Sequence, residues 1–525
     1  MRLENGARIV TTGGGDIEIT GRSQNGGTGV SIEAGGSPSL PGTAPVVQGS
    51  RNVVLRAVND GSTDAIVIGT PVSAANAINL RPGGMDANFV VSDATNAPIV
   101  LGGAGTGGFS VSSAEFARLA APTIVAGSAT HAADITVAGA IATPGALTLQ
   151  NDAGGNIAVN GTVGASQLGL LSDGRITQSA AGAITATGLL ARSSGASVDL
   201  QNPANNVATV SGGAEGGFAY VDANAVTIGA LSVNGFNAAT NQLAPTAAAS
   251  MSAGTVFVRT LAGDLTLGTG VTASTSADLV AAARFQNPGA FTIGAGTWRV
   301  WADTWIGETR GGLAGSGPLP NLYHCAYLGL CTVTVPTTDN HFIYAQQPTA
   351  IVTVGNAARQ EGAPNPSFTY SVSGLILGDN ASSFSGAPGT SANAASPPGN
   401  YPIDGAFASA AGYAIQVVPG NLRVDPGPPP PPAPPAPPVA PPPPPFVFLE
   451  RPELPSVDVV RDQPSTYLYD RNIGQAPICV ATGPLDGDRA AQGGDVLARE
   501  WSRVRSRPNL LSCVNTERRN GCADF

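Results

Sequence analysis

Short, strand-like segments recur about every 20 residues between Asp16 and Val300, and this repeat constrains the fold more than any other feature. Each segment begins with an apolar residue, most clearly at Ile135, Ile157, Ile176, Val198 and Phe218. A second set of strand-like segments lies between these positions, and examples are Leu147–Leu149, Leu168–Leu170 and Val226–Ile228. A fixed period of this size is typical of a solenoid, in which each repeat buries its apolar face only against its neighbours.

The residues between the segments indicate how the repeats turn. Glycine, asparagine, aspartate and serine predominate there, as in Asn151–Gly155 and Ser172–Gly174. Glycine and asparagine tolerate positive φ angles and so supply the corners of a coil. Because similarity returns at every second segment, the pattern favours coils stacked in parallel, and an antiparallel barrel is the structural alternative. Asparagines such as those of Asn202–Asn206 are expected to bond between coils through their amides.

We therefore predict an all-β chain whose residues 1–300 form a parallel β-helical shaft of about 20 residues per coil. Asp16–Thr20 already has the pattern of an ordinary coil, and no capping segment precedes it. Since the open end of a solenoid normally carries a cap, we expect this shaft to be N-terminally incomplete.

The composition restricts the chemistry that is available. All 25 basic residues are arginine, so Schiff-base catalysis, a lysine general base and a lysine-bearing phosphate loop are excluded. The net charge of −10 disfavours nucleic acid and anionic membranes as partners. No apolar run has the length of a transmembrane helix, and Met1–Gly6 does not begin a signal peptide. We predict no cofactor, no nucleic-acid partner and no transmembrane segment.

The repeat breaks near residue 300. The strand-like stretch Thr297–Trp305 holds three of the four tryptophans, which are Trp298, Trp301 and Trp305. An aromatic cluster at the end of a solenoid is expected to cap the last coil against water. A sugar-stacking platform is the functional alternative for the same three residues. We assign residues 301–343 to this aromatic and cysteine-containing cap region.

The five cysteines are too few for a disulfide scaffold. Cys325 and Cys331 bracket one short loop, and Cys513 and Cys522 bracket another, so two local disulfides or free thiols are both compatible with the spacing. His324 beside Cys325 has the residue types of a zinc site, but no second pair of ligands is visible in the sequence. We predict no metal site and no catalytic residue.

Three further zones follow the cap. Residues 344–424 contain four alternating segments separated by Asn-Pro and Pro-Gly-Asn turns, which predicts a small β module. The predicted strands are Ile351–Val354, Phe368–Val372, Tyr413–Val418 and Leu422–Val424. Residues 425–445 carry fifteen of the 43 prolines and are predicted to form a stiff polyproline II linker. Residues 446–525 are richer in charge and are predicted to form a short tail with one helix over Gly494–Arg505.

Two segments resemble a known protein family. Leu168–Leu190, and Asn205–Val210 followed by Phe218–Gly229, are similar to the β-helical shaft of filamentous haemagglutinin-type exoproteins. Residues 344–424 resemble the MBG-type module of bacterial surface fibres through Asn365–Gly374 and Ala411–Gly420, although Gln360-Glu-Gly-Ala stands where a Tyr-Gly turn is usual. The resemblance implies a right-handed parallel β-helix that is exported by a two-partner outer-membrane transporter and displayed on a Gram-negative cell surface.

The resemblance implies adhesion to a receptor or glycan of a host or neighbouring cell, and it supplies no catalytic residue. The secretion domain that the transporter would recognise is not visible in this sequence. Two alternatives come from other functional classes. One is a carbohydrate-active β-helix enzyme, a polysaccharide lyase or hydrolase. Its carboxylate candidates Glu33, Asp86, Asp134 and Asp152 are isolated along the ladder, and Asp60-Gly-Ser-Thr-Asp64 resembles a calcium loop without the bidentate glutamate, which favours a turn. The other is a carrier of a small C-terminal effector within residues 446–525.

Overall fold

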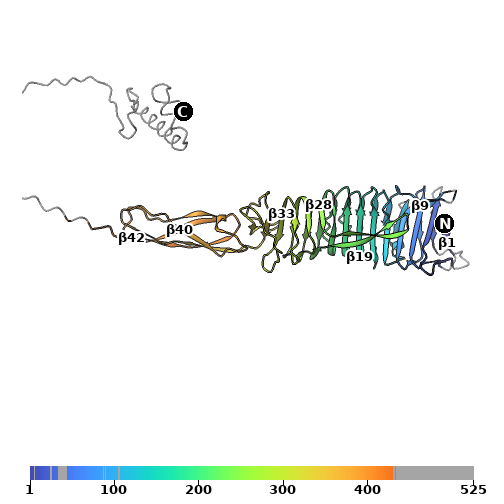
Figure 1. Ribbon diagram of the computed structural model, residues 1–525, viewed down its shortest axis with the longest axis horizontal. Coiled ribbons are helices and arrows are strands. Elements are labelled where there is room, and N and C mark those ends of the chain that lie inside the picture. Colours follow the sequence, from blue (N-terminus) through green and yellow to red (C-terminus); the bar gives the residue numbers. More distant parts are fainter. Residues whose placement is uncertain are drawn as a thin grey trace, which may run out of the picture. The chain divides into compact units, whose positions relative to one another are not determined.

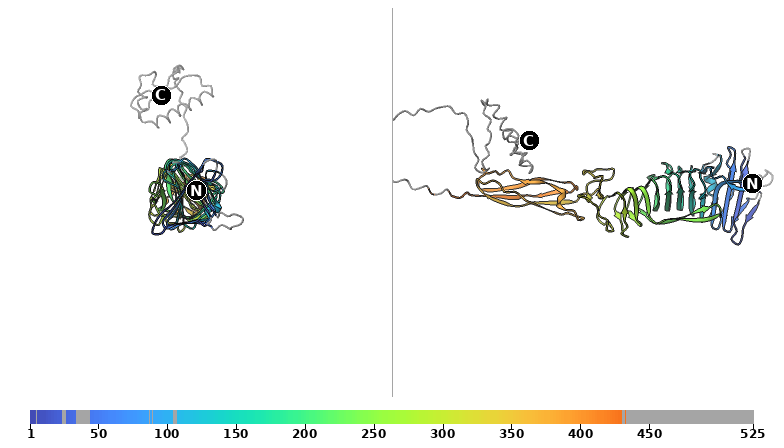
Figure 2. Two further views of the ribbon diagram at one scale, coloured as in Figure 1. Left: turned by 90° about the vertical axis from the view of Figure 1, so that its right-hand side faces the viewer. Right: turned by 45° about the horizontal axis from the view of Figure 1, so that its top comes forward.

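The chain folds into stacked parallel coils followed by a small β module (Figures 1 and 2). The structure, a computed structural model, describes residues 1–4, 6–23, 27–33, 44–86, 88, 90–103, 107–429 and 432. The predicted tail helix, most of the predicted linker, and Cys513 and Cys522 lie outside the described residues. Within the described residues, β-strands dominate and nearly all the pairs between coils are parallel. The parallel β-helix is therefore confirmed, and the antiparallel barrel alternative is wrong.

One row of parallel strands, the first ladder, carries the repeat that is visible in the sequence. Ile135 pairs in register with Ile157, Ile157 with Ile176, Ile176 with Val198, and Val198 with Phe218. All five side chains are buried. The strands of this ladder are β12 (Phe109–Ser112), β11 (Ile99–Gly102), β15 (Ile135–Val137), β18 (Ile157–Val159), β20 (Ile176–Gln178), β22 (Val198–Leu200), β24 (Gly217–Asp222), β28 (Met251–Thr260), β30 (Val271–Val280), β33 (Thr297–Ala302), β35 (His341–Tyr344) and β34 (Asn321–Leu322).

A second row, the second ladder, faces the first across the core. Leu147 pairs with Leu168, Leu168 with Leu189, and Leu189 with Val210, all buried. Burying one such aliphatic side chain contributes about 1.5–3 kcal/mol, so the stacked columns are the main source of stability. The strands of this ladder are β3 (Ile17–Ser23), β6 (Asn52–Asn59), β9 (Ala77–Met85), β14 (Thr123–Gly127), β17 (Ala146–Asn151), β19 (Val163–Ser172), β21 (Ile184–Ser193) and β23 (Asn206–Ala214).

Shorter elements complete the coils. α1 (Ser113–Phe116) is a single turn with a capping box between Ser112 and Glu115. Between adjacent coils, Gln178 and Asn205 exchange two side-chain hydrogen bonds of 2.6 and 3.1 Å, as expected for the asparagine-rich turns. The remaining strands of the coils are β1 (Arg2–Leu3), β2 (Arg8–Val10), β4 (Val30–Ile32), β5 (Val46–Gly49), β7 (Ile66–Ile68), β8 (Val72–Ala74), β10 (Val91–Asp93), β13 (Leu119–Ala120), β16 (Ile141–Ala142), β25 (Val226–Ile228), β29 (Leu265–Leu267), β31 (Phe285–Gln286) and β32 (Ile293–Gly294).

A hairpin over residues 231–248, here called the strap, interrupts the repeat. Its strands β26 (Leu231–Asn237) and β27 (Gln242–Ala248) are antiparallel and lie between β25 and β28 in the chain. The strap runs back across the outward face of the second ladder, as the green strands crossing several coils in Figure 1. Phe236 is buried against Val54 and Val125, whereas Val233 packs on Leu171 and Leu190.

The close approach of the strap requires a small residue beneath it. A Cβ atom added at Gly169, on the outward face of β19, would lie 2.8 Å from Cγ2 of Val233. No real Cβ contact is that short, so any larger residue at this position would displace the strap. The strap was not predicted from the sequence, where its residues read as part of the ladder.

The tip of the strap covers a buried ion network. Asp93 pairs with both Arg56 and Arg81, at 3.1 and 2.9 Å, and the Arg81 side chain is 1% exposed. Arg81 also donates to Asn241 in the strap turn, and its guanidinium lies 5.5 Å from the ring centre of Phe236. Burial lowers the pKa of Arg81, and Asp93 opposes that effect. The network therefore compensates a buried cation and ties the strap to distant coils.

The β module contains two sheets around a small core. One sheet has the order β38 (Tyr370–Ser373), β36 (Thr349–Val354), β41 (Ala414–Val418), and the other β37 (Ala357–Gln360), β42 (Gly420–Asp425), β40 (Gly399–Ser409), β39 (Phe384–Gly389), with the 3₁₀ turn η1 (Ala381–Ser383) before β39. Val354, Ile403 and Leu422 are buried in the core of the module. The predicted strands correspond to β36, β38, β41 and β42. The strands β37, β39 and β40 were missed.

Candidate functional site: the aromatic end of the β-helix

The three tryptophans of β33 and its following turn have different surroundings. Trp298 points into the core, is 4% exposed, and packs edge-on against Phe342 with ring centres 5.1 Å apart. Trp305 is half-buried and packs edge-on against Tyr323 and Tyr344. These two side chains therefore cover the last coil. Trp301, on the opposite face of β33, points outward and is half-buried.

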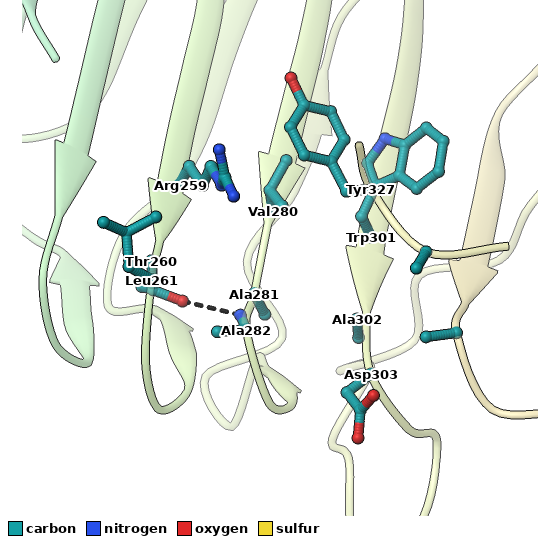
Figure 3. Close-up of a pocket in the computed structure, with 12 residues that line it drawn as sticks. Arg259, Thr260, Leu261, Val280, Ala281, Ala282, Trp301, Ala302, Asp303 and Tyr327 are labelled. Atoms are coloured by element: carbon teal, nitrogen blue, oxygen red, sulfur yellow. Dashed lines mark hydrogen bonds between the residues drawn. The ribbon is translucent and has the colours of Figure 1, made fainter. Parts of the chain in front are cut away.

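Trp301 lies in a row of outward-facing residues on three consecutive coils. Strand register pairs Arg259 of β28 with Val280 of β30, and Val280 with Trp301 of β33. The three strands end immediately after this row and the chain turns a corner. A recess of about 160 Å³ opens there, and Figure 3 shows the side chains that line it. Its other lining residues are Thr260, Leu261, Ala281, Ala282, Ala302, Asp303, Ala326, Tyr327 and Ala345.

Tyr327 reaches the recess from a loop outside the coils. The loop is closed by the disulfide between Cys325 and Cys331, and Cys325 is buried against Leu322 and Ile343. Tyr327 lies edge-on to Trp301, with ring centres 5.3 Å apart and an interplanar angle of 74°. In Figure 3 the Tyr327 ring stands between the Arg259 side chain and the Trp301 indole. The disulfide loop thus supplies one aromatic wall of the recess.

The polar groups of the recess are only partly engaged. Arg259 lies 5.2 Å from the ring centre of Tyr327, and no carboxylate of the described residues pairs with it. Nε1 of Trp301 is buried and has no hydrogen-bond acceptor within the described part of the chain. By contrast, the corner beneath is fixed, because Thr260 accepts a 2.8 Å hydrogen bond from the amide of Ala282 (Figure 3). The recess therefore presents the Arg259 cation and the aromatic rings of Tyr327 and Trp301 above a corner that is held by hydrogen bonds.

A second polar cluster at the same end of the coils is closed. Glu308 accepts hydrogen bonds of 2.8 Å from the hydroxyl of Tyr344 and pairs with Arg310 at 2.5 Å. The guanidinium of Arg310 lies 3.9 Å from the ring centre of Phe342. Burial raises the pKa of Glu308 against the lowering effect of Arg310. Because these side chains form their hydrogen bonds and their ion pair with one another inside the cap, we assign the cluster a structural role.

The carboxylates that the sequence offered for an enzyme do not converge. Asp134 accepts bonds of 2.7 and 3.1 Å from Asn156 on the next coil, and Asp152 accepts from Gln150 at 2.8 Å. Asp64 accepts from the amide of Gly107. These carboxylates hold turns in place. No group of three or more histidine, cysteine or acidic residues capable of holding a metal ion occurs within the described residues, including around His324.

The cap and the β module are joined by a hydrogen-bond network around Asp379. Its Oδ2 accepts from the hydroxyls of Tyr323 and Tyr413 at 2.7 and 2.8 Å, and its Oδ1 accepts from Asn321 at 2.7 Å. Burial, together with Asp379, raises the pKa of Tyr323. Burial also raises the pKa of Tyr413, to about 12. Tyr413 and Tyr323 belong to the same apolar core as the coils, so that core continues into the module.

Residues 350–423 match the family model of the MBG domain, YGX type. No curated protein and no solved structure matches the chain. The resemblance to the MBG module is therefore confirmed for the β module, and the resemblance of the coils to filamentous haemagglutinin-type exoproteins stays a prediction. Among the described residues, no helix has the length and apolarity to cross a membrane.

Sequence reasoning identified Trp301 but missed Arg259 and Tyr327 as its neighbours. Arg259 and Trp301 are two coils apart, so the repeat, extended past the strap, would place them in one row. No comparable signal exists for Tyr327, because the path of the disulfide loop does not follow the repeat.

Proposed function

We propose that this chain belongs to a filamentous surface protein that attaches a bacterial cell to a receptor or glycan through an extended β-helical surface. The observation that carries the proposal is that the stacked coils and the β module share one apolar core. The core of the stacked coils runs into an MBG-type module, and Asp379 ties the two together through Asn321, Tyr323 and Tyr413. Such a joint resists bending and suits a fibre that presents a surface at a distance.

A binding role rather than catalysis is part of this proposal. Asp134 and Asp152 brace turns between coils, and Glu308 is enclosed by Arg310 and Tyr344. Glycosidases instead place two carboxylates on either side of an accessible bond. The family resemblance supports export by a two-partner outer-membrane transporter and display at the cell surface, and both are included in the proposal.

Deletion of the gene in the native organism tests the proposal directly. We expect the deletion strain to lose attachment, and full-length purified protein to compete with wild-type cells for the same surface. Antibodies against the coils should label intact cells. Unchanged attachment on every tested surface, or labelling only after lysis, would contradict the proposal. Turnover of uronic-acid polymers by the purified protein would instead favour a carbohydrate-active enzyme.

A further inference from the structure

The recess at the corner of β28, β30 and β33 has the features of a binding site for one small polar ring. Its volume of about 160 Å³ is below the roughly 300–1,000 Å³ of pockets that enclose drug-sized ligands. Arg259 and Trp301 stand two strands apart, which corresponds to roughly 10 Å. Alanines 281, 282, 302 and 345 form a shallow floor because their side chains are short. A single sugar residue is of the right size for this space.

The positive charge of Arg259 indicates which class of sugar the recess would bind. The Arg259 guanidinium is half-buried over the Tyr327 ring and lacks a carboxylate partner among the described residues. The neighbouring coils contrast with it, since Arg284 pairs with Asp264 at 3.2 Å and Arg299 with Asp278 at 3.6 Å. The Asp303 carboxylate also lines the recess, but it forms no ion pair with Arg259. An arginine that lines a cavity without forming an ion pair favours an anionic ligand, because a charge-assisted pair is stronger than a neutral hydrogen bond.

The aromatic wall favours a ring with an apolar face. Tyr327 and Trp301 are locked edge-to-face at 5.3 Å, and Tyr327 is held by the disulfide loop, so the wall exists before a ligand enters. The C–H face of a pyranose packs against such rings. At the other end, the exposed Asp303 carboxylate can accept hydrogen bonds from hydroxyl groups.

We propose that this recess binds a carboxylated sugar residue of a glycan, with the sugar carboxylate on Arg259 and the ring against the wall of Tyr327 and Trp301. The inference rests on the proposed function and deepens it, because it names the ligand chemistry and the residues that a surface fibre of this kind would use.

Binding of free sugars to the purified full-length protein tests the inference. Glucuronic acid, galacturonic acid and N-acetylneuraminic acid are titrated by calorimetry and by tryptophan fluorescence, with glucose, galactose and the methyl esters of the acids as neutral partners. We expect at least one acid to bind tenfold or more tightly than its neutral partner. Its affinity should fall as the ionic strength rises, because salt screens the pair with Arg259.

Two variants and one matched control locate the site. Arg259→Gln removes the cation at similar volume and is expected to weaken acid binding by tenfold or more. Tyr327→Ala removes the aromatic wall and is expected to abolish the fluorescence response. Arg284→Gln, which removes a cation already paired with Asp264 outside the recess, should bind like the wild type. Circular dichroism and thermal unfolding confirm that each variant is folded.

The possible outcomes distinguish failure of the sugar-binding site from failure of the proposed adhesive function. Equal binding of acids and neutral sugars, no binding of either, or wild-type binding by Arg259→Gln would overturn the site. If the acid binds through Arg259 but deletion of the gene leaves attachment unchanged, the site stands and the adhesive function falls. If attachment requires the gene but no acid binds, the inference about the recess is wrong and the proposed adhesive function stands.

Discussion

Arg81 donates a hydrogen bond of 2.8 Å from Nη2 to Oδ1 of Asn241, a residue 160 positions later in the chain. Asn241 in turn donates to Glu18 and accepts, through its backbone carbonyl, from Asn52. One turn residue of the strap thus bonds to three separate strands of the second ladder. In a solenoid each coil normally contacts only its neighbours, so these bonds add long-range coupling to a structure that otherwise lacks it.

Truncating the strap anchor should loosen several coils together. Phe236 is fully buried against Val54 and Val125, and Phe236→Ala is expected to cost about 3–5 kcal/mol through lost burial and a cavity. Ser232→Ala, an exposed position in the same strand, is the control and should change stability by less than about 0.5 kcal/mol. Urea unfolding and hydrogen exchange of β6, β9 and β14 measure the effect. Equal stability of the two variants would show that the strap does not brace the coils.

Removing the carboxylate at the module joint should detach the β module from the cap. Asp379→Ala leaves the hydroxyls of Tyr323 and Tyr413 without their acceptor, which is expected to cost about 1–3 kcal/mol for each buried group. Limited proteolysis and hydrogen exchange around Tyr323 report the loss of the joint. Asp404→Ala, an exposed carboxylate on β40, is the matched control. Identical protection in both variants would contradict the assigned role of Asp379.

Acidification should destabilise the coils through His131. Its side chain is 2% exposed, and burial lowers the pKa of His131 to about 4, while the charge of Asp93 opposes this shift. The unfolded chain takes up the proton near its ordinary pKa of 6.5, whereas the native chain does not. The stabilising contribution is therefore present above about pH 6.5 and declines toward pH 4, by up to about 3 kcal/mol.

Unfolding free energies at successive pH values check this prediction. His131→Gln should flatten the pH dependence between pH 6.5 and 4, and Thr130→Ala, in the same turn, should retain it. An unchanged slope in His131→Gln would assign the acid sensitivity to other groups.

Opening the disulfide should disorganise the aromatic wall. The bond between Cys325 and Cys331 closes a short loop, and loop-closure entropy assigns such a link about 2 kcal/mol. Cys331→Ser is expected to free Tyr327 from Trp301 and so to change the tryptophan fluorescence. Reductant should reproduce this change in the wild type and have no further effect on the variant. Peptide mapping that finds free thiols at both positions in oxidised protein would contradict the bond.

The sequence alone determined the repeat and therefore the coil. Ile135, Ile157 and Ile176 recur at a spacing that favours stacked parallel strands with these residues in one buried column, and the structure pairs them in register. Four strands of the β module were likewise predicted from alternation. β39 and β40 escaped prediction because glycine and proline interrupt the alternation, as in Phe384–Gly389.

The course of the strap, the joint at Asp379 and the recess beside Tyr327 were determined only by the tertiary structure. The residues of the strap have the same local pattern as a coil. The course of the strap therefore depends on the packing of Phe236 against Val54 and Val125, which lie on distant coils. Asp379 and Tyr327 acquire their partners from loops that follow no repeat. Local periodicity determines the contacts between neighbouring coils, whereas contacts between distant segments depend on surfaces that exist after the coils have stacked.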